Sequence, residues 1–340
     1  MKFELLRRPR AYTDASDEVN LRQPLHRLLL ALLILAEGPV RIGPLSEQLY
    51  EGENLPNDPV DRLYHVKMEL SDALTEAEPA FPGVLKEDGC YRVPVTRPQV
   101  DVFRFRNEVL AARAVARDDT QAARLLRAAI DEWGPYRPGQ RPVPLAGLPG
   151  LRAELLRNTL QAEYRAALIA CLTAELRLGR HEELIPELTA WLNAGEGSSQ
   201  DEELASLLML ACYRAGRRDA ARATFQQLCD GLREIGLEPS SKLTQLYQQI
   251  RNGDPTLDLR NGAPMSVADP SLDETPVTPD TPPAAGYHAP ASAPGVGPGQ
   301  EKAEPQAQPV RIFGDVHQSG PNSTVNQALN QFNYHSPEDT

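Results

Sequence analysis

Paired helical patterns joined by very short turns are the feature that most constrains the fold of this chain. Within residues 204–250, apolar side chains recur three and four residues apart on both sides of Ala215-Gly216-Arg217. This spacing predicts a helix, a tight turn and a second helix. A third helical pattern follows Pro239, which would end one helix, while Ser240 or Ser241 can cap the next.

The same turn occurs earlier as Leu178-Gly179-Arg180, and Gly216 lies 37 residues after Gly179. A looser copy is Ala116-Arg117-Asp118. The interval is close to the period of about 34 residues of tetratricopeptide helix pairs. Three related hairpins predict a stacked helical array in which each pair buries its apolar stripe against its neighbour.

Three aromatic residues in this helical region have two plausible uses. Trp133, Tyr164 and Trp191 could line a ligand groove or could pack in the core. We favour core packing, because large aromatic side chains contribute most of their free energy through burial.

The N-terminal quarter predicts a different, mixed structure. Two short strands, at residues 2–6 and 18–21, precede an apolar helix that begins at Pro24. The second half of residues 40–52 reads as a short helix. Asn57-Asp58-Pro59 then has the form of an N-cap and first turn of a longer helix, which would end near Ala77. Residues 84–93 form two short runs around Asp88-Gly89, a strong hairpin signal. Strands, three helices and a hairpin in this order predict a winged helix-turn-helix.

Charge and cysteine content limit the function classes. The net charge is −12, which argues against a broad basic surface for nucleic acid, so any DNA contact must be local. Cys90, Cys171, Cys212 and Cys229 have no metal-binding spacing and read as free thiols in a reducing compartment. The longest apolar run, residues 28–36, is too short for a membrane span. We expect a cytoplasmic protein.

The segment from Asp101 through AELRLGRHEELIPEL and ACYRAGRRDAARATFQQLCDGLREIGLEPSSKL to Pro255 resembles the bacterial transcriptional activator domain. This is the tetratricopeptide-like half of the Streptomyces antibiotic regulatory protein family. Likewise, RQPLHRLLLALLILAEGPVRIGPLSEQLY and GCYRV match the positions of the first two helices and the returning wing strand in that family's OmpR/PhoB-type winged helix. The resemblance covers about 250 residues.

The resemblance implies a recognition helix that begins near Asp58 and lies in a major groove, with the wing at the adjoining backbone or minor groove. Side chains that could reach bases or phosphates supply the candidate DNA-binding residues, which are Arg62, Tyr64, His65, Lys67, Lys86 and Arg92. The family further implies double-stranded promoter DNA, RNA polymerase or its sigma factor, and a second copy of the chain as partners.

The acidity of the first domain leaves a second interpretation open. Residues 1–106 hold 14 Lys and Arg against 17 Asp and Glu, a difference of −3, and the candidate recognition helix carries Asp61, Glu69 and Asp72. Since phosphate-binding domains are more often basic, Arg62, His65 and Lys67 could belong to a solvated face. The alternative function is then a signalling scaffold or adaptor whose winged helix has weakened DNA binding.

The C-terminal quarter changes composition. Residues 254–309 are rich in Pro, Ala and Gly, which predicts a disordered linker. Residues 310–334 combine β-branched and aromatic residues with Asn and Gln, as cross-β segments do. They resemble short amyloid-type signalling motifs that pair with a like motif on a partner. A simple disordered tail and a peptide that adds to a partner's sheet are the alternatives.

Sequence motifs for phosphate-binding loops, dinucleotide binding, metalloprotease helices and nucleophile elbows are absent from the chain. We therefore expect no enzyme activity, no cofactor and no metal. The prediction is a mainly α protein that regulates transcription, and the resemblance to the family implies that it acts as an activator. Its parts are a winged helix-turn-helix DNA-binding domain at 1–97, a tetratricopeptide-like helical domain at 98–253, a disordered linker at 254–309 and a tail with a β-pairing motif at 310–340.

Overall fold

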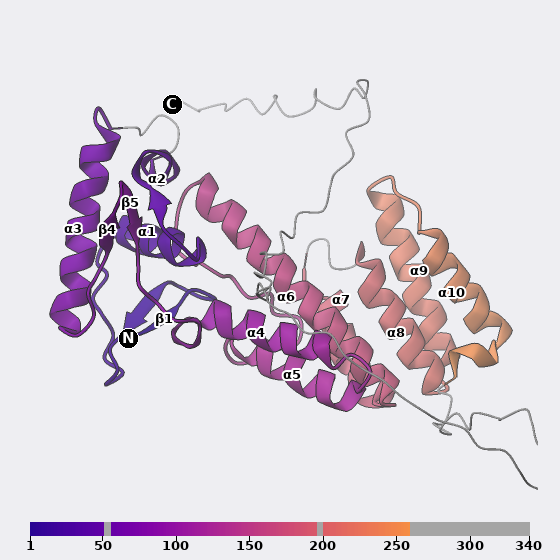
Figure 1. Ribbon diagram of the computed structural model, residues 1–340. Helices are drawn as coiled ribbons and strands as arrows, with labels where there is room; N and C mark the ends of the chain where they lie inside the picture. Colours follow the sequence, from indigo (N-terminus) through magenta and orange to yellow (C-terminus); the bar gives the residue numbers. More distant parts are fainter. Residues whose placement is uncertain (51–55, 196–199, 259–340) are drawn as a thin grey trace, which may run out of the picture. The chain divides into compact units, whose positions relative to one another are not determined.

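The computed structural model describes residues 1–50, 56–195 and 200–258 (Figure 1). Of the predicted linker and tail, only residues 254–258 are described; Pro255–Leu257 form a short 3-10 helix there, so the prediction of disorder from residue 254 was wrong for these residues. Residues 259–340 lie outside the described residues. The N-terminal part contains short strands and three helices, namely β1 (Lys2–Glu4), β2 (Arg10–Tyr12), α1 (Pro24–Leu35), β3 (Val40–Arg41), α2 (Ile42–Leu49), α3 (Pro59–Ala77), β4 (Leu85–Glu87) and β5 (Cys90–Arg92).

The three helices surround one apolar core. α1 begins at Pro24, as predicted, and its run of leucines is buried almost all round because α2, α3 and β5 pack on it. β3, β5 and β4 form a three-stranded antiparallel sheet in that order, with Lys86 opposite Tyr91 and Arg41 opposite Cys90. The predicted winged helix-turn-helix is confirmed.

One strand prediction was wrong. The partner of β1 is β2 at Arg10–Tyr12 rather than residues 18–21, with Phe3 opposite Ala11. Residues 18–21 contribute only an isolated bridge between Glu18 and Tyr12 and a hydrogen bond from the Val19 N–H to the Ala11 carbonyl of 2.8 Å. Val19 and Leu21 are buried, as the alternation of apolar and polar residues at 18–21 predicted. This segment is nevertheless not the strand that pairs with β1.

The rest of the described chain is helical. It comprises η2 (Arg97–Gln99), α4 (Asp101–Ala114), α5 (Asp119–Asp131), α6 (Leu151–Arg177), α7 (His181–Leu192), α8 (Glu202–Arg214), α9 (Arg218–Glu234), α10 (Ser241–Asn252) and η4 (Pro255–Leu257). α4 packs against α5, α5 against α6, α7 against α8, and α8 against α9, while α10 contacts both α8 and α9 (Figure 1). The predicted turns lie between α4 and α5, α6 and α7, and α8 and α9, and the mainly α, tetratricopeptide-like array is confirmed.

The predicted core role of the three aromatic residues is also confirmed. Trp133, Tyr164 and Trp191 are each at most 6% exposed. Trp133 makes edge contacts with Phe105 at 5.4 Å and with Tyr164 at 4.9 Å between ring centroids. These contacts join α4, the segment after α5, and α6, so the rings stabilise the stack of helices.

The remaining features concern the cysteine thiols, metal-binding groups and membrane-spanning helices. Cys171 and Cys212 are buried, Cys90 and Cys229 are half-buried, and all four are free thiols. Within the described ranges, no group of His, Cys, Asp or Glu has the geometry to hold a metal ion, and no helix is both long and apolar enough to cross a membrane.

Candidate nucleic-acid interface

Helix α3 is held against the core along a single stripe. Its N-cap is Asp58, whose carboxylate accepts hydrogen bonds from the N–H groups of Val60 at 3.1 Å and Asp61 at 2.9 Å. Pro59 occupies the first turn, as the sequence predicted. The buried residues lie at helical spacing and leave the opposite side of the 19-residue helix in solvent; they are Leu63, Val66, Leu70 and Leu74.

Two polar contacts fix the position of α3. The Nε2 atom of buried His26 on α1 lies 2.9 Å from a carboxylate oxygen of Glu69. On the other side, the Ser71 hydroxyl accepts a hydrogen bond of 3.1 Å from the N–H of Val84, directly before β4. The wing therefore starts from a fixed point on α3.

The wing is a tight hairpin. β4 and β5 are joined by Asp88 and Gly89, with φ values of +45° and +72°. Two successive positive φ values belong to the turn type that Asp-Gly favours, because this turn matches the twist of the strands. The hairpin predicted at residues 84–93 is confirmed.

Arg62 and Tyr64 lie on opposite shoulders of α3. At 100° per residue, the two side chains point about 160° apart around the helix axis. Arg62 neighbours Tyr50 at the end of α2: burial raises the pKa of the Tyr50 hydroxyl, and the positive charge of Arg62 acts against this shift. Tyr64, 46% exposed, neighbours buried Tyr91 of the wing. The structure thus places the two candidates on the α2 side and the wing side, respectively.

His65 lies between these shoulders, on the outermost ridge of α3. It is exposed, and its Nε2 atom lies 3.6 Å from Asp61 Oδ2. Asp72 and Glu76 are exposed further along the same helix and fall near the same ridge by helical spacing. The outermost ridge is therefore predominantly acidic, whereas the cation Arg62 is at its side.

The remaining candidates differ in how available their charges are. Lys67 is half-buried, with its Nζ atom 3.9 Å from the sulfur of Met68. Lys86 is exposed on β4. Arg92 donates to both carboxylate oxygens of Glu87, at 2.9 and 3.0 Å, across the wing. This bidentate pair lowers the pKa of Glu87 and neutralises the guanidinium that the sequence suggested for DNA.

Arg41 is a cation of the wing that the sequence analysis missed. It is exposed in β3, opposite Cys90, and the next residue, Ile42, donates its N–H to the carbonyl of Gly89 at 3.1 Å. The sequence analysis assigned no structure to residues 40–41, since a two-residue strand carries no periodic signal. Arg41 and Lys86 belong to the two edge strands of the same small sheet.

Comparison with known proteins places this arrangement in a family. Residues 100–251 match the bacterial transcriptional activator domain. The chain is 33% identical over 282 residues to the regulatory protein AfsR of Streptomyces coelicolor, a match that covers 80% of this chain and 26% of AfsR. It is also 31% identical over 252 residues to the regulatory protein DnrI of Streptomyces peucetius, covering 71% of this chain and 89% of DnrI.

A solved structure of Mycobacterium tuberculosis EmbR, in complex with a low-affinity phosphopeptide, is similar in fold, with a TM-score of 0.67 and 25% identity. The match covers 75% of this chain and 65% of the EmbR chain. The chain spans about a quarter of the length of AfsR but most of DnrI. With its winged helix and its helical array, the protein belongs to the Streptomyces antibiotic regulatory protein family of transcriptional regulators.

Proposed function

We propose that the protein is a sequence-specific DNA-binding regulator, an activator, whose helix α3 enters a major groove of promoter DNA. The observation that carries the proposal is the exposure of α3 opposite its single buried stripe, beside a wing that is fixed to the helix through Ser71. A helix presented in this way is what major-groove reading requires. The regulatory proteins AfsR and DnrI are its relatives, which supports the role.

In this proposal the candidate residues have separate tasks. Arg62 and His65 reach base edges or phosphates from α3, and Tyr64 and Lys67 contact the strand on the wing side. Lys86, with Arg41, meets the adjoining backbone. Arg92 contributes through the rigidity of the wing, because its charge is engaged by Glu87.

The helical array would then join two copies of the chain on DNA and contact RNA polymerase or its sigma factor. Two copies side by side would place their α3 helices about 34 Å apart, one helical turn of DNA. A footprint on the target promoter that covers two such half-sites supports this arrangement, whereas a single protected half-site contradicts it. The proposed partner contact through residues 310–334 lies outside the described residues.

The deciding experiment is binding of the full chain to DNA from upstream of its own and neighbouring genes, titrated against salt beside generic DNA. We expect one site to be preferred, with an affinity that falls as salt rises. Arg62→Ala should weaken specific binding by about 1–3 kcal/mol if it reads a base. The matched control is Arg222→Ala, an exposed arginine on α9. Equal binding to all sequences would contradict the proposal.

The acidic ridge of α3 favours a second candidate, a signalling scaffold that binds a protein through this helix. Asp61, Asp72 and Glu76 are exposed there, and carboxylates repel phosphates unless each accepts a hydrogen bond from a base. Asp72→Asn separates the two candidates. If the protein is a DNA-binding regulator, this change should strengthen DNA binding. If it is a scaffold that uses the acidic ridge, the change should weaken its affinity for the protein partner.

A further inference from the structure

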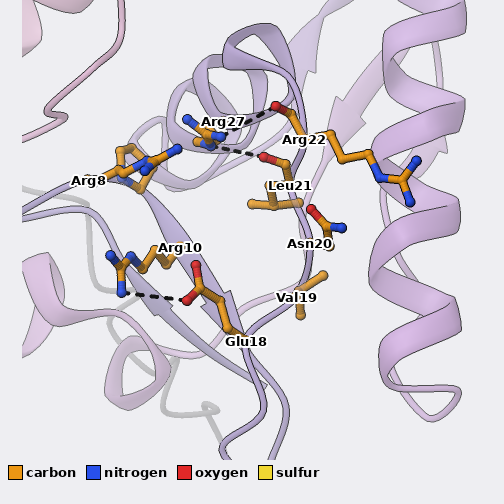
Figure 2. A pocket seen from close by; sticks show the side chains of 9 residues that line it. Arg8, Arg10, Glu18, Val19, Asn20, Leu21, Arg22 and Arg27 are labelled. Carbon is orange, nitrogen blue, oxygen red and sulfur yellow. Dashed lines mark hydrogen bonds and ion pairs between the residues drawn. The ribbon is translucent and has the colours of Figure 1, made fainter.

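A hollow lined by arginines lies at the N-terminal end of α1, outside the candidate DNA interface. It has a volume of about 490 Å³ (Figure 2). Its walls come from the start of β2, from residues 18–22 and from the first turns of α1. The charged groups of the lining are Arg8, Arg10, Glu18, Arg22 and Arg27. None of the six candidate DNA-binding residues contributes to it.

Three of these guanidinium groups lie close to one another. Arg27 is half-buried and is held in place by donating to the carbonyl of Leu21 at 3.0 Å. Burial lowers the pKa of Arg27, and the positive charges of Arg8 and Arg10 act in the same direction, while the carboxylate of Glu18 opposes them. In Figure 2, Arg8 lies beside Arg27, whereas Arg22 extends away from them.

Negative charge in the hollow is insufficient to balance these cations. Glu18 is the carboxylate of the lining, and it lies 3.6 Å from Arg10. Arg8 forms no ion pair with any residue that the structure describes. With Arg22, which extends away from the other three, the lining holds four arginines against one glutamate, an excess of three positive charges. Like charges that converge in this way repel one another unless an anion binds between them.

The start of helix α1 adds to the imbalance. Its N-cap, Gln23, makes no side-chain capping hydrogen bond, and its first turn contains no acidic residue. The N-terminal end of a helix carries the positive end of the helix dipole and normally attracts an acidic group. Here the charged residues next to this end in the sequence are Arg22 and Arg27, which carry the opposite sign.

We propose that this hollow binds a small phosphorylated compound, with a phosphoryl group held between Arg8, Arg10 and Arg27. The fork of a guanidinium matches two phosphate oxygens, and a side chain already fixed by the protein loses little entropy on binding. The volume lies within the range of small-molecule sites, about 300–1,000 Å³. No aromatic side chain lines the hollow, so recognition is of the phosphate rather than of a ring. A diphosphate matches the charge better than a single phosphate.

The test uses the full chain and inorganic pyrophosphate. Thermal unfolding and calorimetric titration are measured at constant ionic strength, with sodium chloride as the reference salt. We expect pyrophosphate to raise the unfolding temperature above that in sodium chloride and to bind with one site. No effect beyond that of sodium chloride overturns the proposal.

Three variants assign the binding to the hollow. Arg8→Gln should weaken pyrophosphate binding about tenfold, since one charge-assisted hydrogen bond is lost. Glu18→Gln should tighten binding a few-fold, because it removes the carboxylate that competes for Arg10. The control Arg222→Gln, on exposed α9, should leave binding unchanged. Equal affinities for all three variants and the parent chain overturn the proposal.

DNA binding by the same variants shows whether the phosphate comes from a small molecule or from the DNA backbone. Each backbone phosphate bound contributes about 0.9 to the slope of log affinity against log salt. We expect Arg8→Gln to leave this slope for DNA unchanged. A slope reduced by about 1, together with no binding of pyrophosphate, overturns the small-molecule proposal and assigns the hollow to the DNA backbone.

Discussion

Asp101 joins the first strand segment of the chain to the helical array through a buried carboxylate. It is 2% exposed at the start of α4. Its carboxylate accepts hydrogen bonds from the N–H groups of Leu5 at 2.9 Å, Leu6 at 3.0 Å and Val102 at 2.8 Å. The first residues of the chain are therefore anchored by a side chain about one hundred positions away.

Burial raises the pKa of Asp101 from its ordinary value of 3.8 to about 6, because loss of water outweighs the stabilising N–H groups. The folded chain thus binds this proton more tightly than the unfolded chain. The resulting stability is fully present below about pH 4 and is lost as the pH rises through about 6. A shift of about 2 units corresponds to about 3 kcal/mol.

The expected result is a fall of about 3 kcal/mol in the free energy of unfolding of the parent chain, relative to Asp101→Asn, between pH 4 and pH 7. The asparagine variant does not titrate in this range. Urea unfolding at several pH values measures the difference, and Asp72→Asn, at an exposed position of α3, serves as the control. If the parent chain instead becomes more stable relative to Asp101→Asn as the pH rises, the hydrogen bonds to Asp101 outweigh the effect of burial on its pKa.

At the scale of single residues, the sequence predicted which side chains carry a positive charge better than it predicted which of those charges are free to bind DNA. Arg62, His65 and Lys86 were identified from their chemistry, and all three are exposed. The partner of Arg92, Glu87, becomes its neighbour only through the register of the hairpin. The arginine hollow was missed for the same reason, because its residues converge only through packing.

The wing as an element depends on how closely its root approaches α3. Gly83 has a φ of +69°, and a Cβ atom there would lie 2.3 Å from the Ser71 hydroxyl. Gly89, at the tip, has a φ of +72° but open space around the same position. The two glycines share a backbone conformation and differ in their surroundings.

Replacing each glycine by alanine separates these two effects. Gly89→Ala should cost about 1 kcal/mol, the strain of a left-handed residue with a side chain. Gly83→Ala should cost at least about 2–3 kcal/mol, since it also displaces the hydroxyl that accepts from Val84. Unfolding free energies of the two variants test this; equal costs would show that the root of the wing moves freely relative to α3.

Helices α5, α6 and α7 are joined by a partly buried ionic network. Arg127 donates to Glu175 on α6 and, at 3.0 Å, to Glu187 on α7. The Tyr136 hydroxyl also donates to Glu187 and accepts from the indole N–H of Trp191 at 2.9 Å. The side chains of Glu175 and Glu187 are only 6% and 14% exposed, and Arg127 is the cation that they share, while Glu175 also pairs with Arg180 at 3.3 Å.

Removal of that cation should be costly. Arg127→Met removes the cation shared by two desolvated carboxylates, of which Glu175 keeps its pair with Arg180, and should lower the free energy of unfolding by about 3–5 kcal/mol. The control Arg233→Met removes an exposed pair with Asp230 and should cost less than about 1 kcal/mol. Urea unfolding followed by the fluorescence of Trp133 and Trp191 measures both. Similar losses for the two variants would contradict a structural role of the network.

At the scale of elements, local chemistry decided which predictions succeeded. The wing was found because Asp88-Gly89 specifies its turn, and α3 because Asp58-Pro59 specifies its start. β2 was misplaced because Ala11, its buried central residue, carries little strand signal. Its position is determined instead by pairing with β1, where Phe3 also bridges to Val100.

The described part of the molecule has contacts that run across the predicted boundary at residue 97. The N–H of Leu145 donates to the carbonyl of Leu5 at 3.1 Å, and that of Ala146 to Arg7 at 3.2 Å. Glu37, after α1, pairs with Arg106 on α4 at 3.3 Å. The described residues, which end at 258, belong to one compact unit. We infer that the winged helix and the helical array unfold together.

Two measurements test this cooperativity. The two tryptophans, Trp133 and Trp191, report only on the helical array, whereas hydrogen exchange of α1 and α3 reports on the winged helix. Both probes should give one urea midpoint in the full chain.

The fragment 1–97 loses Asp101, which leaves the buried N–H groups of Leu5 and Leu6 without their acceptor. Its free energy of unfolding should be lower by at least about 3 kcal/mol than that of the winged helix in the full chain. A fragment of equal stability, or two separate midpoints, would mean that the contacts across residue 97 orient the two parts without coupling their folding. In that case the helical array could transmit a signal to α3 only by reorienting the winged helix as a rigid body.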